Sequence, residues 1–371
     1  MRQSVVPMLW IPAPRAAGGS AAHADAAATT PLRDRRQRAW RDLRISLTDR
    51  CNFRCDYCMP RSRFGPGHRF LPQARLLSFE EISQVAQQAL QLGVRTLRLT
   101  GGEPLLRRDL PLLVRQLAAL RTPEGEAPDL ALTTNGSLLA EQAAVLRAAG
   151  LQRLTVSLDA LDAALFARMN GVGFAVTQVL RGLEAAQAAG FERIKINMVV
   201  RRGVNDAEAL PLAAHFRASG MVLRFIEFMD TGCDSAWRPD EVLPSAELRA
   251  RLAARWPLRP LAASRGGETA ERWAYADGAG EVGFISSVSQ AFCGDCTRAR
   301  LTADGRLFTC LFGSQGHDLR PLLRGTTGHP AALRETLASI WRQRGDAYSE
   351  QREQLRGQAL HARAEMHELG G

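Results

Sequence analysis

Six of the seven cysteines in this 371-residue chain fall into two short clusters. The first cysteine set is Cys51, Cys55 and Cys58, with three and then two intervening residues; the second cysteine set is Cys293, Cys296 and Cys310, with two and then thirteen. Because no secretory signal is recognisable, such clusters are more often metal sites than disulfides. Zinc and iron–sulfur sites normally take four protein ligands. Each set stops at three, which leaves one ligand to be supplied from elsewhere.

Two kinds of metal site can be built on three thiolates. A structural zinc ion at the second cysteine set needs a fourth ligand, for which Cys233 or His317 is available. A four-iron cluster held by three thiolates instead leaves one iron open to a substrate or cosubstrate. Cys233 matches no ligand spacing, and we interpret it as a buried free thiol.

The basic residues are almost all arginine. Of the 48 Lys and Arg residues, only Lys195 is a lysine. An ammonium is a compact point charge, whereas a guanidinium is a planar fork. Lys195 is therefore a candidate for a contact that an arginine cannot make.

The positive charge is unevenly placed along the chain. The formal net charge is +10, and half of it falls within residues 1–44. Residues 1–38 are rich in Ala, Pro, Gly and Arg without an apolar period, so we predict a disordered N-terminal extension. The remaining charges nearly cancel and aromatic residues make up 6% of the chain, which argues against a nucleic-acid-binding surface. No apolar stretch approaches roughly 18 residues, so no membrane span is expected.

Helices and strands alternate after residue 75. Helical stretches end at Gly93, Gly150, Gly190 and Gly220, and a β-rich run follows each glycine. Ser78 and Glu81 form a capping-box pattern at the start of the first helix. With two further runs at 43–48 and 130–134, six strands alternate with helices, which predicts a parallel α/β sheet.

The placement of the distinctive residues favours a barrel over an open sheet. We expect them at the carboxyl ends of the strands: 48–50, 100–104, 133–136, 157–159, Lys195 with Asn197, and 227–230. A barrel gathers such ends onto one rim, where barrel enzymes carry their chemistry. From about residue 236 the pattern becomes irregular, so we predict a barrel domain at 39–235 and a second domain at 236–371.

Seven ordered motifs resemble a known family. "CNFRCDYC" is similar to the three-cysteine motif of the radical S-adenosylmethionine (SAM) superfamily. Around it, "LRISLTDRCNFRCDYCMP", "LRLTGGEPLLRRDL", "TTNG", "IKINMVV", "LRFIEFMD", "GFISSVSQAFCGDCTRARLTADGRLFTCLFG" and the terminal "GG" resemble the GTP cyclases that begin molybdenum cofactor biosynthesis. The resemblance covers about residues 40–371.

The resemblance implies a fold and an activity. The fold is an incomplete (βα)6 TIM-like barrel of the radical SAM type, with a C-terminal α+β domain that carries a second iron–sulfur cluster. Each cysteine set holds one [4Fe-4S] cluster, and SAM binds the first. A radical derived from SAM takes hydrogen from C3′ of GTP, and the product is 3′,8-cyclo-7,8-dihydro-GTP. The protein itself orients the reacting groups, provides polar contacts and excludes water.

The same resemblance assigns individual residues. The SAM contacts are Tyr57, Gly102, Ser157 and Met229, and the GTP contacts are Arg44, Arg98, Thr133, Lys195, Arg298, Ala299 and Arg300. Guanidinium groups suit a triphosphate because each offers paired N–H donors and stays charged. The terminal Gly370 and Gly371 are expected in the active-site pocket, and we count them as catalytic together with Arg44, Lys195, Arg298 and Arg300.

Partners and rival functions complete the expectations. The resemblance implies a flavodoxin- or ferredoxin-like electron donor and cyclic pyranopterin monophosphate synthase as the next enzyme, and it leaves a homodimer open. The clustered cysteines indicate a reducing, cytoplasmic location. We expect neither nucleic acid nor a membrane as partner. One alternative is another radical SAM enzyme with an auxiliary cluster, such as a peptide maturase. The remote alternative is a zinc-stabilised nucleic-acid-binding protein.

Overall fold

A single twelve-stranded sheet runs through the folded part of the chain. The structure is a computed structural model that describes residues 31–231, 237–325, 329–355 and 363–370. Cys233 and Gly371, both named in the sequence analysis, lie outside the described residues.

The six predicted strands are present, parallel and in sequence order within the sheet. They are β1 (Asp42–Ser46), β2 (Thr96–Thr100), β3 (Asp129–Thr134), β4 (Arg153–Ser157), β5 (Ile194–Val200) and β6 (Val222–Glu227).

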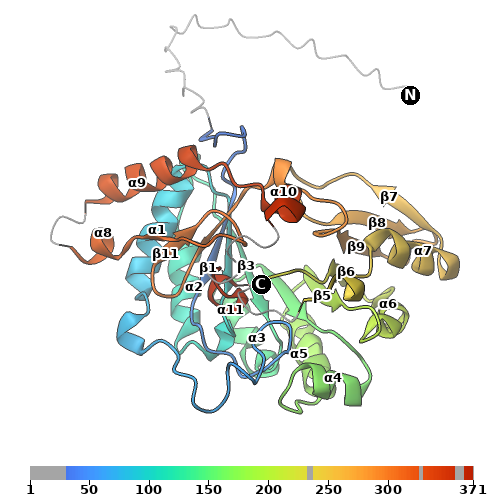
Figure 1. Cartoon of the computed structure of the whole chain (residues 1–371). Helices are drawn as coiled ribbons and strands as arrows, with labels where there is room; N and C mark the ends of the chain where they lie inside the picture. The colour runs from blue at the N-terminus through green and yellow to red at the C-terminus, as the bar shows by residue number, and fades with distance from the viewer. Residues whose placement is uncertain (1–30, 232–236, 326–328, 356–362, 371) are drawn as a thin grey trace, which may run out of the picture. The chain divides into compact units, whose positions relative to one another are not determined.

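Helices cover the outer face of these strands (Figure 1). They are α1 (Phe79–Gln91), α2 (Leu110–Ala119), α3 (Leu139–Ala148), α4 (Ala163–Met169), α5 (Val176–Ala188) and α6 (Ala209–Phe216). The four predicted stop glycines follow α1, α3, α5 and α6, each with a positive φ between 78° and 108°. The capping box at α1 is also confirmed, since Ser78 Oγ accepts from the Glu81 amide at 3.2 Å and Glu81 Oε2 accepts from the Ser78 amide at 2.7 Å.

Strand alternation sorts the side chains into two layers. In β1, Leu43 and Ile45 are fully buried in the apolar core that also contains the inner faces of the helices. Arg44, between them, lines a cavity on the opposite face of the sheet. Successive side chains of a strand point to opposite faces. The barrel interior is therefore polar, unlike the branched apolar filling of most barrels of this kind.

The C-terminal region extends the same sheet at both edges. Its strands are β7 (Leu258–Leu261), β8 (Glu271–Tyr275), β9 (Glu281–Ile285), β10 (Arg298–Leu301), β11 (Arg306–Phe308) and β12 (His317–Asp318), and its helices are α7 (Ser245–Arg255), α8 (Arg320–Arg324), α9 (Pro330–Gln343), α10 (Tyr348–Leu355) and α11 (Met366–Leu369). Strand β10 pairs in parallel with β1, and β9 pairs in parallel with β6. The region expected as a separate irregular domain thus continues the barrel sheet, while the predicted boundary at residue 235 stays a prediction.

Residues 31–38 differ from the extended tail that the composition predicts. Asp34 and Arg38 form a buried ion pair at 2.6 Å, and Arg38 donates to the Cys293 carbonyl at 2.8 Å. Trp40 stacks on Trp341 of α9 with ring centroids 5.4 Å apart. Long-range contacts therefore fold a polar segment that local composition marks as disordered.

Candidate active site

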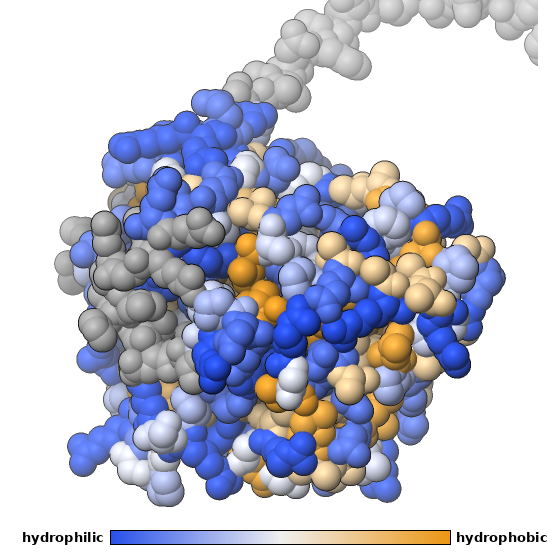
Figure 2. All heavy atoms as spheres, turned by 45° about the vertical axis from the view of Figure 1, so that its right-hand side comes forward, coloured by the Kyte–Doolittle hydropathy of each residue, from blue (hydrophilic) through white to orange (hydrophobic). Residues whose placement is uncertain are grey.

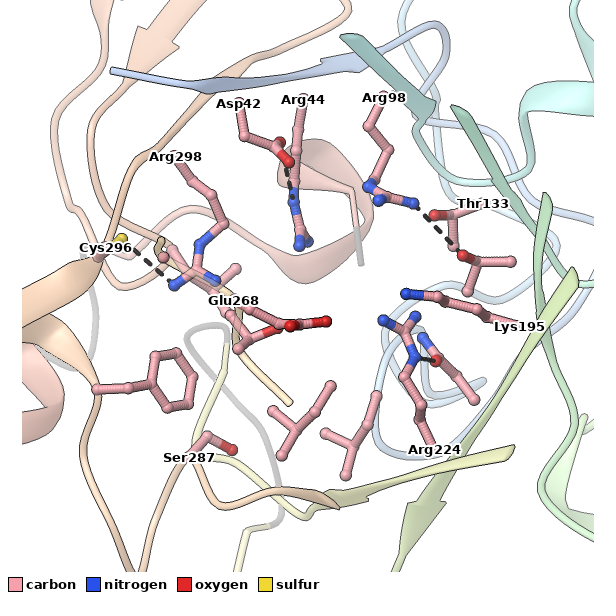
Figure 3. Close-up of a pocket in the computed structure, with 18 of the residues that line it drawn as sticks. Asp42, Arg44, Arg98, Thr133, Lys195, Arg224, Glu268, Ser287, Cys296 and Arg298 are labelled. Carbon is pink, nitrogen blue, oxygen red and sulfur yellow. Dashed lines mark hydrogen bonds and ion pairs between the residues drawn. The ribbon is translucent and has the colours of Figure 1, made fainter. Parts of the chain in front are cut away.

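The inner face of the sheet encloses a cavity of about 710 Å³. Side chains from all six parallel strands and from the C-terminal region line it, as the close-up in Figure 3 shows for Arg44, Arg98, Lys195 and Arg298. Thr133 of β3 completes the inward row on the barrel side. Six of the seven predicted GTP contacts, these five and Arg300, therefore share one cavity.

Strand parity explains how these side chains come together. Asp42 and Arg44 in β1, and Arg153 and Thr155 in β4, occupy alternate positions and all line the cavity. Arg224 of β6 also lines the cavity, and its Nε donates to the side-chain oxygen of Asn197 at 3.0 Å. A parallel register places equivalent residues of neighbouring strands at one level of the barrel.

The cavity has an excess of positive charge. Ten Arg and Lys side chains line it against five Asp and Glu, counted among the described residues. Burial, followed by repulsion from Arg224, lowers the pKa of Lys195 to about 8. Burial and neighbouring arginines likewise lower the pKa of Arg224 to about 9 and that of Arg300 to about 10. Each lowered pKa reports a cation that lacks sufficient counter-charge in the free protein, so the cavity is suited to a polyanion.

The second cysteine set faces this cationic cavity. Cys293, Cys296 and Cys310 all line it, on the side formed by the C-terminal region. Arg298 donates from Nη2 to Cys296 Sγ at 3.3 Å, as Figure 3 shows. Burial alone would raise the pKa of Cys296, but the guanidinium groups of Arg298 and Arg344 outweigh it and lower this pKa to about 6.

The residues of "CTRAR" divide between the two faces of β10. Arg298 and Arg300 line the cavity, as predicted. Ala299 is 1% exposed and packs in the apolar core on the other face. The resemblance also assigned Ala299 to GTP, but its side chain does not reach the cavity.

The C-terminal tail docks into the barrel beside Arg300. Arg300 Nη1 donates to the carbonyl oxygens of Leu369, at 3.0 Å, and Gly370. Ser46 Oγ, at the end of β1, donates to the Glu368 carbonyl at 2.6 Å. Gly370 has φ +70°, and a Cβ there would lie 2.1 Å from Thr100 Cγ2. The described part of the tail is therefore anchored by Arg300, a residue that lines the cavity, while the entry of the terminal glycines into the cavity stays a prediction.

The first cysteine set lies in the loop after β1, outside the cavity lining. A tight turn forms there, since the Cys58 amide donates to the Cys55 carbonyl at 3.1 Å. Burial, followed by Glu103, raises the pKa of Cys51 to about 11, and burial followed by Cys51 raises that of Cys58 to about 12. The thiols are thus near enough to act on one another electrostatically.

Two of the predicted SAM contacts, Tyr57 and Gly102, lie in or against this loop. Tyr57 donates to Asp159 Oδ2 at 2.6 Å, just beyond Ser157 at the end of β4. Gly102 packs against the same loop so closely that a Cβ would lie 2.2 Å from the Arg50 carbonyl oxygen. Met229, after β6, lines the cavity.

The sequence placed Lys195 wrongly within its strand and missed several cavity residues. Lys195 is the second residue of β5, at the amino end and not the carboxyl end. It reaches the cavity because its side chain points inward, not because it lies on the rim. Arg153, Arg224 and Glu268 also line the cavity and were not predicted. Inward parity would have found both arginines, whereas Glu268 lies in the β7–β8 connection, which has no periodic signal.

The chemistry of the cysteines fits the groups implied by the resemblance. All six described cysteines are free, and each set offers three thiols with no fourth among the described residues. Within those residues, no three His, Cys, Asp or Glu side chains form a site for a single metal ion. At the second cysteine set, three thiols beside an open cavity suit a polynuclear cluster with one exchangeable position. His317, considered as a zinc ligand, does not line the cavity.

Comparison with known proteins identifies the family. A sequence model described as "Radical SAM superfamily" matches residues 45–215, and one described as "Molybdenum Cofactor Synthesis C" matches residues 221–350. A protein of Xanthomonas axonopodis pv. citri (strain 306), named GTP 3′,8-cyclase, is 56% identical over 324 residues, which cover 87% of this chain and 95% of that protein. This chain belongs to the GTP 3′,8-cyclase family of radical SAM enzymes. The relatives support this family over both alternatives considered from the sequence.

Solved structures confirm the radical SAM fold at low sequence identity. SuiB of Streptococcus suis bound to the precursor peptide SuiA has a TM-score of 0.56 and 14% identity, covering 84% of this chain and 64% of that one. SuiB bound to S-adenosylmethionine has a TM-score of 0.55 and 14% identity, covering 90% and 72%. At this identity the likeness concerns the fold alone.

Across the residues that the structure describes, none of the helices is sufficiently long and apolar to span a membrane. On the face shown in Figure 2, hydrophilic residues predominate and hydrophobic ones lie among them.

Proposed function

We propose that this enzyme is a GTP 3′,8-cyclase, a lyase that converts GTP into 3′,8-cyclo-7,8-dihydro-GTP in the first step of molybdenum cofactor biosynthesis. The observation that carries the proposal is the shared cavity, in which the second cysteine set faces a field of inward-pointing cations. The triphosphate of GTP needs several charged hydrogen-bond donors, and the guanine base needs a site at one end of the cavity. The name of the 56%-identical relative supports the same substrate.

The basic side chains would hold the triphosphate. Arg44, Arg98 and Lys195 approach from β1, β2 and β5, and Arg298 approaches from β10, the strand next to β1, beside Cys296. In a cavity that excludes most water, each ion pair is screened less than at the surface. Binding a polyanion would also offset the burial and the repulsion from Arg224 that lower the pKa of Lys195.

Two [4Fe-4S] clusters are part of the proposal, one at each cysteine set. When SAM and the first cluster are bound, they supply the radical that takes hydrogen from C3′ of GTP. Tyr57, Gly102, Ser157 and Met229 would contact SAM, and the residues of the chain supply position and charge. The docked tail with Gly370, and Gly371 beyond the described residues, would close the cavity and keep water from the reactive centre.

The finer partners belong to the proposal as well. A flavodoxin- or ferredoxin-like protein would deliver electrons, and cyclic pyranopterin monophosphate synthase would use the product. We propose a cytoplasmic location, because open-iron clusters and free thiols persist in reducing surroundings. A homodimer is compatible with the proposal and not required by it.

Metal analysis combined with product analysis tests the function. Protein purified or reconstituted without oxygen should contain about eight iron and eight sulfide per chain and no stoichiometric zinc. With a reductant, SAM and GTP, the cyclised nucleotide should form, whereas ATP should give none. About four iron with one zinc would contradict the second cluster, and SAM cleavage that ignores GTP would contradict the substrate.

A further inference from the structure

A buried arginine contacts the second cysteine set from outside the cavity. Arg344 follows helix α9, and its side chain is 1% exposed. Its Nη2 lies 3.1 Å from Cys296 Sγ, and its Nη1 donates to the Cys296 carbonyl at 2.7 Å. One guanidinium therefore holds both the sulfur and the backbone of a predicted cluster ligand.

Three neighbours fix the guanidinium of Arg344, and a fourth holds its backbone. Asp346 accepts from its Nε at 3.2 Å, and Asp34 Oδ2 lies 3.7 Å from its Nη1. The Arg344 guanidinium carbon also lies 4.6 Å from the ring centroid of Trp341. The Arg35 amide donates to the Arg344 carbonyl at 3.1 Å. The side chain is thus held on all sides before any cluster is bound.

Arg344 differs from Arg298, the other arginine at this sulfur. Arg298 Nη2 lies 3.3 Å from Cys296 Sγ, but Arg298 also lines the cavity and is available to substrate. Arg344 is not among the residues that line the cavity. Its contact with the sulfur is therefore independent of what the cavity contains.

We propose that Arg344 is a positioning residue that sets the reduction potential of the cluster at the second cysteine set. The inference rests on the proposed function, because it requires a cluster there. A cationic donor at a ligand sulfur favours the more negative, reduced state of a cluster and so raises its potential. Because the contact is buried, salt screens it little. Arg344 also fixes the orientation of Cys296 relative to the cavity.

A redox titration tests the proposal directly. In the full-length chain, the three cysteines of the first set are replaced by Ala, so that a single cluster gives the electron paramagnetic resonance signal. Arg344→Gln should leave the iron content at about four and lower the ratio of reduced to oxidised cluster about tenfold at a fixed potential. For a one-electron couple this corresponds to a midpoint lower by about 59 mV. Arg342→Gln is the matched control, since Arg342 is exposed and pairs with Glu335 at 2.9 Å.

A second variant gives a shift of opposite sign. Asp34→Asn removes an anion next to Arg344, so the midpoint should rise, whereas general loosening of the site would move both variants in the same direction. An unchanged midpoint in Arg344→Gln, or loss of iron in both variants, would overturn the inference. If the variant that lacks the first cysteine set but retains Arg344 contains no iron, the result would instead contradict the proposed function.

Discussion

Lys195 provides a pH test of the cavity. Burial and Arg224 favour its neutral form in the free protein, and the pKa is lowered from 10.5 to about 8. A bound phosphate favours the charged form, so binding above pH 8 requires uptake of a proton. The affinity for GTP should therefore weaken as the pH rises through 8. Lys195→Arg should weaken this dependence, because a guanidinium in the same surroundings loses its proton at a higher pH than an ammonium does.

The size of the effect follows from the pKa. A group with a pKa of about 8 is about one tenth neutral at pH 7 and about nine tenths neutral at pH 9. If only the ammonium form binds the phosphate, the affinity falls about tenfold between these two values. The same shift affects stability when no ligand is bound. Between pH 8 and 10.5 the folded chain has lost the proton of Lys195 and the unfolded chain still holds it, so the contribution of Lys195 to the free energy of unfolding rises with pH over that range.

Calorimetric titration of GTP into anaerobic holoenzyme without SAM measures the effect. Dissociation constants are compared at pH 7 and pH 9 in the native enzyme and in Lys195→Arg. Ionisation of the nucleotide itself changes both proteins equally, so the ratio between them isolates residue 195. An equal loss of affinity in both proteins would refute the assignment of Lys195 to the triphosphate.

Three further substitutions test other parts of the site. Gly370→Ala places a Cβ 2.1 Å from Thr100, so the tail should be displaced and turnover should fall at least about tenfold. The control is Gly278→Ala, where the glycine has a similar φ of +80° but an added Cβ would meet open space. An equal loss of turnover in the control would contradict a specific role of the tail. Cys296→Ala should abolish cyclisation while reductive SAM cleavage, followed as 5′-deoxyadenosine by chromatography, continues; loss of both activities would count against separable clusters. Gly102→Ala brings a Cβ 2.2 Å from a backbone carbonyl, so SAM affinity in equilibrium binding should fall about tenfold or more, and unchanged affinity would contradict the close approach.

The barrel could be predicted because its signals are local. Capping by Ser78 and glycines such as Gly93 and Gly150 mark the ends of helices, and short apolar runs mark the strands between them. These features depend on residues a few positions apart. Both cysteine sets were equally visible, because their spacing is contained in short segments.

Long-range pairing could not be predicted in the same way. The β1–β10 ladder joins Asp42 to Arg298, and Arg344 reaches Cys296 from the end of a helix. Neither contact leaves a periodic trace in the sequence. In a chain with so many arginines, Arg224 and Arg344 were indistinguishable from surface charges until the fold buried them. Lys195 was found from its rarity, although its position along the strand was predicted incorrectly.

Transfer of deuterium from substrate to SAM tests the central claim most directly. Anaerobic, reduced holoenzyme is incubated with SAM and GTP that carries deuterium at C3′, and the 5′-deoxyadenosine formed is examined by mass spectrometry. The proposed function predicts one deuterium in this product, together with formation of the cyclised nucleotide. Unlabelled 5′-deoxyadenosine formed at the same rate with and without GTP would contradict it.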